Sequence, residues 1–395
     1  MTRRVYLDNN ATTPLLPEVL EAMQPYFGEH FGNASSIHHH GQETRAAVER
    51  ARASVAALVG CRGSEVVFTS GGTEADNLAI FGIVRSGDHV ITSTIEHHAV
   101  LNACKHLAKN RGNVACEVTY IPVDGRGLVD PDDVKRALRP NTKLITVMYA
   151  NNETGVMQPV EEIGKIAAEA DVYFHSDAVQ AAGKITIDAN KIGCDLLTIS
   201  GHKIHGPQGA GALYVRKGTA LEAMLYGGSH ERSRRAGTEN VPGIVGLGKA
   251  AELAIAGFER GDDRKMVAAR DRLERELLKI EATGLNSALN GEVAPRVPNT
   301  TNIYFDGIDG EALIIALDLK GLAVSTGAAC SSGAIEPSHV LTAMGLRSDR
   351  AKASIRISLG KQTTAQDIDF ALAIVPETVS HLRQLSPVYR TMVSK

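Results

Sequence analysis

The stretch VVFTSGGTEADNLAI, residues 66–80, decides the fold class of this chain. It opens with the short apolar run VVFT, passes through the small residues SGGT and continues into a helix-like pattern. Residues 66–69 have the length and composition of a buried strand, and a strand that runs directly into a helix is half of a β-α-β unit. We therefore expect a parallel sheet built from repeats of this unit.

The same alternation of strands and helices extends from about residue 15 to residue 256. Amphipathic, helix-like segments such as residues 43–59 and 160–170 lie between strand-like runs. These further runs are residues 89–92, 144–149, 172–175, 196–199 and 211–215. Stacked β-α units predict an α/β fold with a mostly parallel central sheet. We assign residues 15–256 to this large domain.

A second, smaller domain is predicted from the remaining sequence. A charged segment at residues 262–281 has the periodicity of a connecting helix. Thr364 and Asp367 have the spacing of a capping box at the start of a final helix. The other elements expected here are strands at 302–305 and 353–358 and helices at 310–320 and 365–385. We predict an α+β domain formed by residues 1–14 and 257–395.

Size and charge exclude several classes of protein. The 395 residues are enough for two domains, and 42 basic against 45 acidic residues give a net charge of -3. This balance offers no electrostatic case for nucleic acid or an anionic membrane as a partner. The N-terminus has no apolar stretch of a secretory signal, and no run of 18 apolar residues occurs. We expect a cytoplasmic protein.

The five cysteines do not form a metal or disulfide pattern. The closest pair, Cys104 and Cys116, is 12 residues apart and there is no C-x-x-C, which argues against a zinc or iron–sulfur site built by this chain alone. Cys61 and Cys194 are, like that pair, expected to be small buried residues. Cys330 lies in VSTGAACSSGAIEP, residues 324–337. Two interpretations of Cys330 stay open here: a small residue of the core, or a reactive thiol on a movable loop.

Polar groups follow several strands at the edge where ligands bind in parallel α/β sheets. Gly72 and Thr73 belong to SGGT, a turn whose N–H groups and helix dipole suit a phosphate. The turn lacks the lysine of a P-loop, which favours a single cofactor phosphate. The alternative is an ordinary helix start with Thr73 as its N-cap.

Asp177 lies just beyond the predicted strand at 172–175, at the end of the run His175-Ser176-Asp177, and Gln180 follows closely. A carboxylate at a buried strand end is costly unless it faces a positive charge, such as a protonated pyridine nitrogen. Gln180 is then placed to bond a ring hydroxyl. The alternative for Asp177 is the N-cap of a following helix.

Lys203 follows the strand at 196–199, together with Ser200 and His202, and precedes a glycine-rich turn. A lysine in a partly desolvated pocket can lose its proton and form an imine with an aldehyde. The alternative is a solvated surface charge, the usual state of lysine.

His97 lies in IEHH after the strand at 89–92, where its ring could stack on a flat cofactor and move protons, or simply solvate a helix start. An anion site, a buried acid, an imine-forming lysine and a stacking histidine together fit pyridoxal phosphate.

Gly243, Gly248 and Lys249 match the spacing of a P-loop, but Ala250 lacks the required hydroxyl. We expect that segment to be a helix of small residues packed against a neighbour.

These motifs carry a resemblance to a known family. The matching blocks are YLDNNATTP, FGNASS, FTSGGTEADN, IEHHAV, ANNETGV, FHSDAVQAAGK, SGHKIHGPQG, RRAGTEN, STGAACSSG, EPSHVL and SIRISLG. Along essentially its whole length the chain resembles the cysteine desulfurases, pyridoxal-phosphate enzymes of the class V aminotransferase group. ANNETG, DAVQAAGK and RRAGTEN look closer to the nitrogen-fixation (NifS-type) branch. The resemblance implies the fold-type I architecture of pyridoxal-phosphate transferases and a homodimer.

The resemblance also implies roles for individual residues. Lys203 would carry the cofactor as an imine, and Cys330 would be the nucleophile that accepts sulfur, with His97 as proton acceptor. The cofactor contacts would come from Gly72, Thr73, His97, Asp177, Gln180, Ser200, His202 and Lys203, and from Thr238 of the neighbouring subunit. Asn152 and Arg356 would hold the substrate carboxylate, a bidentate role that suits arginine.

The implied activity converts L-cysteine to L-alanine and leaves a persulfide on Cys330. An iron–sulfur scaffold protein would accept the sulfur, with nitrogenase maturation as one use, and Cys330 would contact the nascent cluster there. Three alternatives stay open. They are a selenocysteine lyase, an ordinary aminotransferase that has no use for Cys330, and a non-catalytic scaffold for iron–sulfur assembly.

Overall fold

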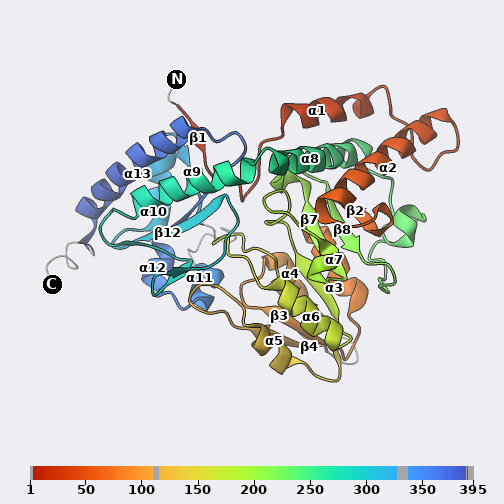
Figure 1. Ribbon diagram of the computed structural model, residues 1–395, viewed down its shortest axis with the longest axis horizontal. Helices are drawn as coiled ribbons and strands as arrows, with labels where there is room; N and C mark the ends of the chain where they lie inside the picture. Colours follow the sequence, from red (N-terminus) through yellow and green to blue (C-terminus); the bar gives the residue numbers. More distant parts are fainter. Residues whose placement is uncertain (1–2, 110–114, 327–336, 388, 390–395) are drawn as a thin grey trace.

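A computed structural model describes residues 3–109, 115–326, 337–387 and 389 of the chain (Figure 1). Its centre is a seven-stranded sheet in the order β2-β8-β7-β6-β5-β3-β4. The strands are β2 (Val66–Thr69), β3 (His89–Ser93), β4 (Glu117–Ile121), β5 (Thr142–Thr146), β6 (Tyr173–Asp177), β7 (Leu196–Ser200) and β8 (Gly211–Val215). β8 is antiparallel to both of its neighbours, and all pairs from β7 to β4 are parallel. The prediction of a mostly parallel sheet is confirmed.

Two strands differ from the sequence-based expectation. The sequence predicts one strand at 144–149, but β5 ends at Thr146. Beyond it, Tyr149 donates its backbone N–H to the carbonyl of Asp177 at the end of the neighbouring strand β6. β4 was missed because it lies at the sheet edge, where only its last residue is buried and no continuous apolar run is needed. The sequence therefore predicts the strands whose ends position the site, but it does not predict the polar edge strand β4.

Helices cover the sheet on both faces. They are α1 (Pro17–Met23), α2 (His39–Val59), α3 (Gly72–Ile83), α4 (His98–Ala108), α5 (Pro131–Ala137), α6 (Val160–Glu169), α7 (Ala189–Ile192) and α8 (Val241–Glu259). α8 packs so closely on α2 that a Cβ at Gly248 would lie 2.6 Å from the Cα of Ala51. The prediction of a small-residue helix packed against a neighbour is confirmed. Among the described helices, α8 alone is long and apolar enough to cross a membrane, and 56% of that stretch is buried inside the protein, as a core helix is.

The C-terminal part forms a second, smaller layer. β9 (Thr283–Leu285), β12 (Thr300–Phe305) and β14 (Ser354–Ser358) make an antiparallel sheet, and β1 (Val5–Tyr6) pairs with β13 (Leu322–Ala323). α13 has the predicted bounds, Ala365–Leu385, and a complete capping box. The remaining elements are α9 (Asp262–Leu277), α10 (Gly310–Leu319), α11 (His339–Ala343), α12 (Ser348–Lys352) and the hairpin β10 (Ala288–Leu289) with β11 (Glu292–Val293).

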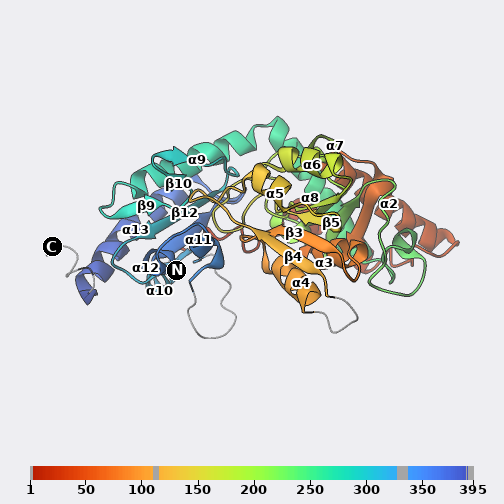
Figure 2. The same ribbon diagram turned by 90° about the horizontal axis from the view of Figure 1, so that it is seen from below.

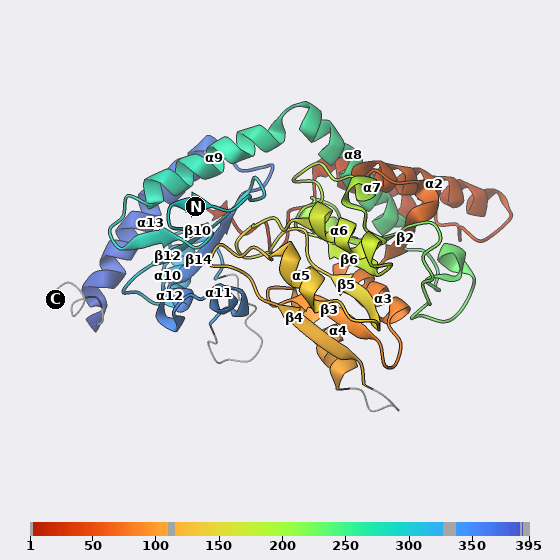
Figure 3. The same cartoon turned by 60° about the horizontal axis from the view of Figure 1, so that its bottom comes forward.

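Separate sets of buried apolar side chains belong to the two layers. Val5 and Leu7 join Leu273, Leu313 and other C-terminal residues in one of them, so the N-terminal strand packs with the end of the chain. Figure 1 shows β1 beside α13, although the two elements are far apart in the sequence. Figure 2 shows the large sheet with its helices side by side with the C-terminal layer. α9 follows α8 and leads from the large sheet's side of the molecule to the C-terminal layer (Figure 3). The boundaries at residues 15 and 256 stay a prediction.

Candidate active site

One cavity brings most of the predicted site residues together. It has a volume of about 380 Å³ and lies where β2, β5, β6 and β7 end. Eleven of the predicted site residues are described by the structure, and ten of them line this cavity, the exception being Thr238. The ten are Gly72, Thr73, His97, Asn152, Asp177, Gln180, Ser200, His202, Lys203 and Arg356. A volume of this order suits a small cofactor with its substrate.

Lys203 ends the short 3-10 turn that follows β7, and it is not the solvated lysine of the alternative interpretation. Its Nζ atom donates to the backbone oxygens of Asn10 and Ala11, at 2.6 and 2.7 Å. Burial, helped by the positive charge of Arg356, lowers the pKa of Lys203 to about 8. A tenth or so of such an amine is neutral at pH 7, which makes it a usable nucleophile and base.

Asp177 is the last residue of β6 and is buried. Its Oδ1 accepts the Val179 N–H at 2.9 Å, so one oxygen does cap the next turn, but no helix follows in that segment. Burial raises the pKa of Asp177, although His97, the Val179 N–H and Lys203 all favour the carboxylate. A buried carboxylate whose partners only partly satisfy it is suited to a cationic ring nitrogen.

His97 is the N-cap of α4, and its Nδ1 accepts the backbone N–H of Ala99 at 3.1 Å. The helix-start interpretation is therefore correct, and it is compatible with a cofactor role because the ring also lines the cavity. Burial lowers the pKa of His97, although Asp177 opposes the shift. A neutral ring with Nδ1 engaged leaves Nε2 as the nitrogen that exchanges protons.

The glycine turn at α3 forms the predicted cup. The helix begins at Gly72 with Gly71 as N-cap, so the alternative of Thr73 as the cap is wrong. The Glu74 carboxylate accepts the Ser70 N–H at 2.8 Å and pairs with Arg235, which ties the turn in place. A Cβ at Gly72 would lie 2.9 Å from the Val179 side chain, so the close approach favours glycine. The first N–H groups of α3 thus face the cavity beside Ser200 and His202.

Arg356 reaches the cavity from β14 of the second sheet. One of its terminal nitrogens donates to Asp8 Oδ1 at 2.6 Å and the other to the Asn152 carbonyl at 2.9 Å. Its Nε is buried without a hydrogen-bond partner among the described residues. A buried guanidinium with an unsatisfied N–H is a site for an anionic group.

Comparison with known proteins agrees with this geometry. Residues 5–370 match the model of the class V aminotransferase family.

The chain belongs to the class V aminotransferases.

Within this family it is 50% identical, over 99% of its length and 96% of the relative, to a protein named cysteine desulfurase IscS from Methanosarcina thermophila. Among solved structures it resembles a NifS-like protein, with a TM-score of 0.87, 36% identity and coverage of 96% of this chain and 100% of that one. It also resembles SspA in complex with cysteine, with a TM-score of 0.77, 37% identity and coverage of 91% and 99%. The predicted cysteine desulfurase resemblance and fold-type I architecture are confirmed.

Class V aminotransferases are pyridoxal-phosphate enzymes, and the residues present fit this cofactor. The cofactor's aldehyde can form an imine with Lys203, whose pKa is lowered, and its protonated ring nitrogen can pair with the buried Asp177 carboxylate. Its phosphate can bind at the N-terminus of α3. The Arg356 guanidinium adds a positive charge to the same cavity. The cofactor prediction is confirmed, while the role of each residue stays a prediction.

One described site residue of this class V aminotransferase lies elsewhere. Thr238 lines a different cavity with Asn33 and His230, and its contact with the cofactor of a neighbouring subunit stays a prediction. Cys330 lies outside the described residues.

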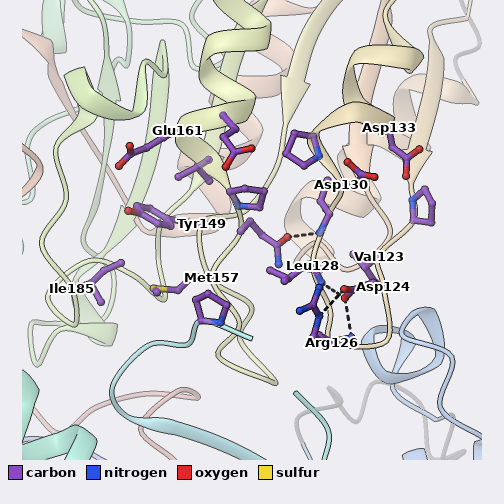
Figure 4. A pocket seen from close by; sticks show the side chains of 18 residues that line it. Val123, Asp124, Arg126, Leu128, Asp130, Asp133, Tyr149, Met157, Glu161 and Ile185 are labelled. Carbon is purple, nitrogen blue, oxygen red and sulfur yellow. Dashed lines mark hydrogen bonds and ion pairs between the residues drawn. The ribbon is translucent and has the colours of Figure 1, made fainter. Parts of the chain in front are cut away.

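Another cavity, of about 920 Å³, is not the predicted site (Figure 4). Tyr149, Met157 and Ile185 form an apolar wall, and the acids Asp130 and Glu161 stand at its rim. No lysine, histidine or cysteine is among its lining residues, so it offers none of the groups that an imine-forming site needs. Tyr149 directly follows Met148, which lines the smaller cavity. The segment that follows β5 therefore separates the two cavities.

Sequence reasoning missed three residues at the site. Asn10 accepts Lys184 Nζ at its Oδ1, at 2.9 Å, and its carbonyl accepts Gln180 Nε2, at 3.0 Å. Lys184 also donates to Gln180 Oε1 at 2.5 Å, so it fixes the orientation of that amide. Asp76 lines the cavity from α3. Two signals in the sequence point to them. Asn10 belongs to the polar pair at the end of YLDNN, and Asp76 is a lone acid within the largely apolar residues 75–80.

Proposed function

We propose that this protein is a cysteine desulfurase that removes sulfur from L-cysteine, releases L-alanine and carries the sulfur on Cys330 for iron–sulfur cluster assembly. The observation that carries the proposal is the convergence of Lys203, Asp177 and Arg356 on one cavity. These supply the base, the ring partner and the carboxylate clamp that an amino-acid-converting pyridoxal-phosphate enzyme needs. The relatives named cysteine desulfurase, and the neighbour solved with cysteine, support this substrate.

When bound, pyridoxal phosphate supplies an electron sink that stabilises negative charge at the substrate Cα. Asp177 would hold the ring nitrogen, and Gln180, already oriented by Lys184 and Asn10, would bond the ring hydroxyl. The first turn of α3 with Ser200 and His202 would bind the phosphate.

Lys203 serves as the base for the Cα proton of L-cysteine. With a pKa of about 8, its amine is neutral often enough to accept a proton and basic enough to keep it. Once protonated, the ammonium finds two fixed acceptors in the carbonyls of Asn10 and Ala11. The lysine therefore has a defined position while the proton is held at Nζ.

Arg356 and Asn152 hold the substrate carboxylate. The Arg356 guanidinium is fixed by Asp8 on one terminal nitrogen and by the Asn152 backbone on the other. The Arg356 guanidinium and Asn152 both line the cavity, where they would meet a carboxylate. This clamp orients the amino acid in the cavity.

The sulfur step needs a thiolate at Cys330, because an ordinary cysteine with a pKa of about 8.5 is mostly protonated at neutral pH. The neutral His97 ring is the proposed acceptor of that proton. As the thiolate forms a bond to the substrate sulfur, the carbon–sulfur bond of L-cysteine breaks and its electron pair stays with the carbon. That carbon takes up a proton, and the balance is L-alanine plus a persulfide, with no external oxidant.

A homodimer, a scaffold acceptor and a cytoplasmic location complete the proposal. Phe31, Ile37 and Tyr226 are exposed apolar side chains, 71%, 93% and 88% accessible, and such surface suits a subunit interface. The segments that carry them border the cavity holding Thr238, which would reach the neighbour's cofactor from there. The sulfur acceptor would be an iron–sulfur scaffold protein. The link to nitrogen fixation stays a prediction from ANNETG, DAVQAAGK and RRAGTEN.

The experiment that tests the function is Cys330→Ala. The purified variant is expected to keep the visible absorbance of bound cofactor and to lose alanine formation from L-cysteine. Mass spectrometry of the wild type after L-cysteine should show one added sulfur on the peptide with Cys330. Cys61→Ala is the matched control, since burial raises the pKa of that thiol to about 12 and leaves it inert. Continued desulfuration by Cys330→Ala, or keto acid in place of alanine, contradicts the proposal.

A further inference from the structure

Asp76 is a buried acid that the mechanism above does not use. It lies in the second turn of α3, is 1% exposed and lines the cofactor cavity. Its Oδ1 has no hydrogen-bond partner among the described residues. One polar atom each of Asp76, His97 and Asp177 lie within 4.8 Å of one another. A second carboxyl group therefore lies within 4.8 Å of the Asp177 carboxyl group, in the lining of the same cavity.

The nearest ring offers Asp76 no positive charge. His175 Nε2 is 3.6 Å from Asp76 Oδ1, but its Nδ1 bonds Thr146 Oγ1 at 2.8 Å and its Nε2 bonds Thr198 Oγ1 at 3.0 Å. Burial lowers the pKa of His175 to about 3, so the ring is neutral. The Thr198 hydroxyl, from β7, is then the one group that favours the Asp76 anion.

Among the described residues, Asp177, Glu96 and His97 lie near Asp76, and Lys203 lines the same cavity. Glu96 is a further buried acid, and burial raises its pKa to about 8. His97 and Lys203 act on Asp177, since both favour its charged form, and Lys203 Nζ is turned to the Asn10 and Ala11 carbonyls. Of the two acids, Asp177 is therefore the one with neighbours that favour a carboxylate.

Two carboxylates this close in a buried site cannot both be charged, because each destabilises the other and neither is solvated. Asp177 has the Val179 N–H and the nearby His97 and Lys203, whereas Asp76 has an unsatisfied oxygen. The shared proton consequently belongs on Asp76. In agreement, burial, with Asp177 adding to it, raises the pKa of Asp76 well above its ordinary value.

We propose that Asp76 is a positioning residue: kept as the neutral acid, it donates its hydroxyl proton to Asp177, so that a single negative charge faces the cofactor ring nitrogen. The inference rests on the proposed role of Asp177. It predicts that the side chain at 76 must donate a hydrogen bond and need not carry charge. Asparagine keeps the shape and an N–H donor, and Asp76→Asn should therefore be tolerated far better than Asp177→Asn.

The first test measures pyridoxal-phosphate binding to cofactor-free protein by equilibrium dialysis. Asp76→Asn should weaken binding about threefold at most, and Asp177→Asn about a hundredfold, since only the latter removes a charge-assisted contact. Asp76→Ser, a smaller donor, should fall between them. Equal weakening by Asp76→Asn and Asp177→Asn overturns the inference. Wild-type binding by Asp177→Asn instead overturns the proposed role of Asp177, so the two failures are distinguishable.

The second test measures the thermal stability of the cofactor-free protein from pH 5 to pH 9. Asp76 binds its proton more tightly in the folded state, so its contribution to stability is full below the unfolded pKa and is lost as pH rises towards the folded one. Asparagine does not titrate. The melting temperature of Asp76→Asn relative to wild type should therefore rise with pH. A constant difference at every pH marks a purely structural role and overturns the inference.

Discussion

The amine of Lys203 and the backbone oxygen of Asn10 are 2.6 Å apart, although the two residues are 193 positions apart in the chain. The N-terminal segment thus supplies the acceptor for the catalytic base. Asn10 is itself held by Ser358 Oγ, Thr300 Oγ1 and Lys184. The base is therefore oriented by both layers of the protein.

The pH dependence of cofactor recapture should report the Lys203 amine. Cofactor-free protein should regain its visible absorbance faster as pH rises, with a plateau above about pH 8, because burial and Arg356 lower the pKa of Lys203 to about 8. Stopped-flow absorbance at a series of pH values measures this midpoint. Arg356→Gln should move it to higher pH by removing one positive charge. A midpoint near that of free lysine, about 10.4, would contradict the assignment.

Arg356→Lys should raise KM for L-cysteine about tenfold or more, with a smaller change in kcat. Lysine keeps the positive charge, but it lacks the planar donor set that binds Asp8, Asn152 and a carboxylate together. Steady-state kinetics of alanine formation measure the split. Arg350→Lys is the control, because Arg350 pairs with Asp306 and does not line the cavity. Equal effects of the two substitutions would mean that the loss is structural.

Glu96→Gln should stabilise the protein increasingly as pH rises from 5 to 9. Burial raises the pKa of Glu96 to about 8, so the wild type loses stability through this window while glutamine does not titrate. Ser93 and the Met148 N–H both bind Oε1, and an amide oxygen can accept these bonds. Melting temperatures of the two proteins at each pH give the difference. The exposed Glu169→Gln is the control, and a parallel trend there would contradict the explanation.

Gly248→Ala should destabilise the α2–α8 packing. The added Cβ would lie 2.6 Å from the Cα and the Cβ of Ala51, and backbone cannot rotate away, so a cost of about 1–3 kcal/mol is expected. Urea denaturation measures it. Gly28→Ala is the control, since nothing lies within 4 Å of a Cβ there. Similar midpoints for Gly248→Ala and the wild type would show that the helices can separate at little cost.

The sequence predicts those parts of the fold and site that depend on local pattern. The strand at 66–69, the helix at 365–385 and the polar groups at strand ends follow from periodicity and cap spacing, which act within a few residues. Asn10 and Lys184 were not found, because their contacts arise only when distant segments pack together. Asp76 was overlooked since a single acid in an apolar helix gives no periodic signal. The edge strand β4 lacks a buried face to reveal it.

The pairing of β1 with β13 has a consequence for how the enzyme is made. Val5 and its partner Leu322 lie far apart along the chain, so the pairing cannot form until the segment that carries Leu322 has been synthesised. Asn10 follows β1 closely, and its carbonyl is one of the two acceptors of the Lys203 amine. All seven strands of the large sheet precede β13 in the chain. We therefore expect the catalytic centre to be completed after the strands of the large sheet have left the ribosome.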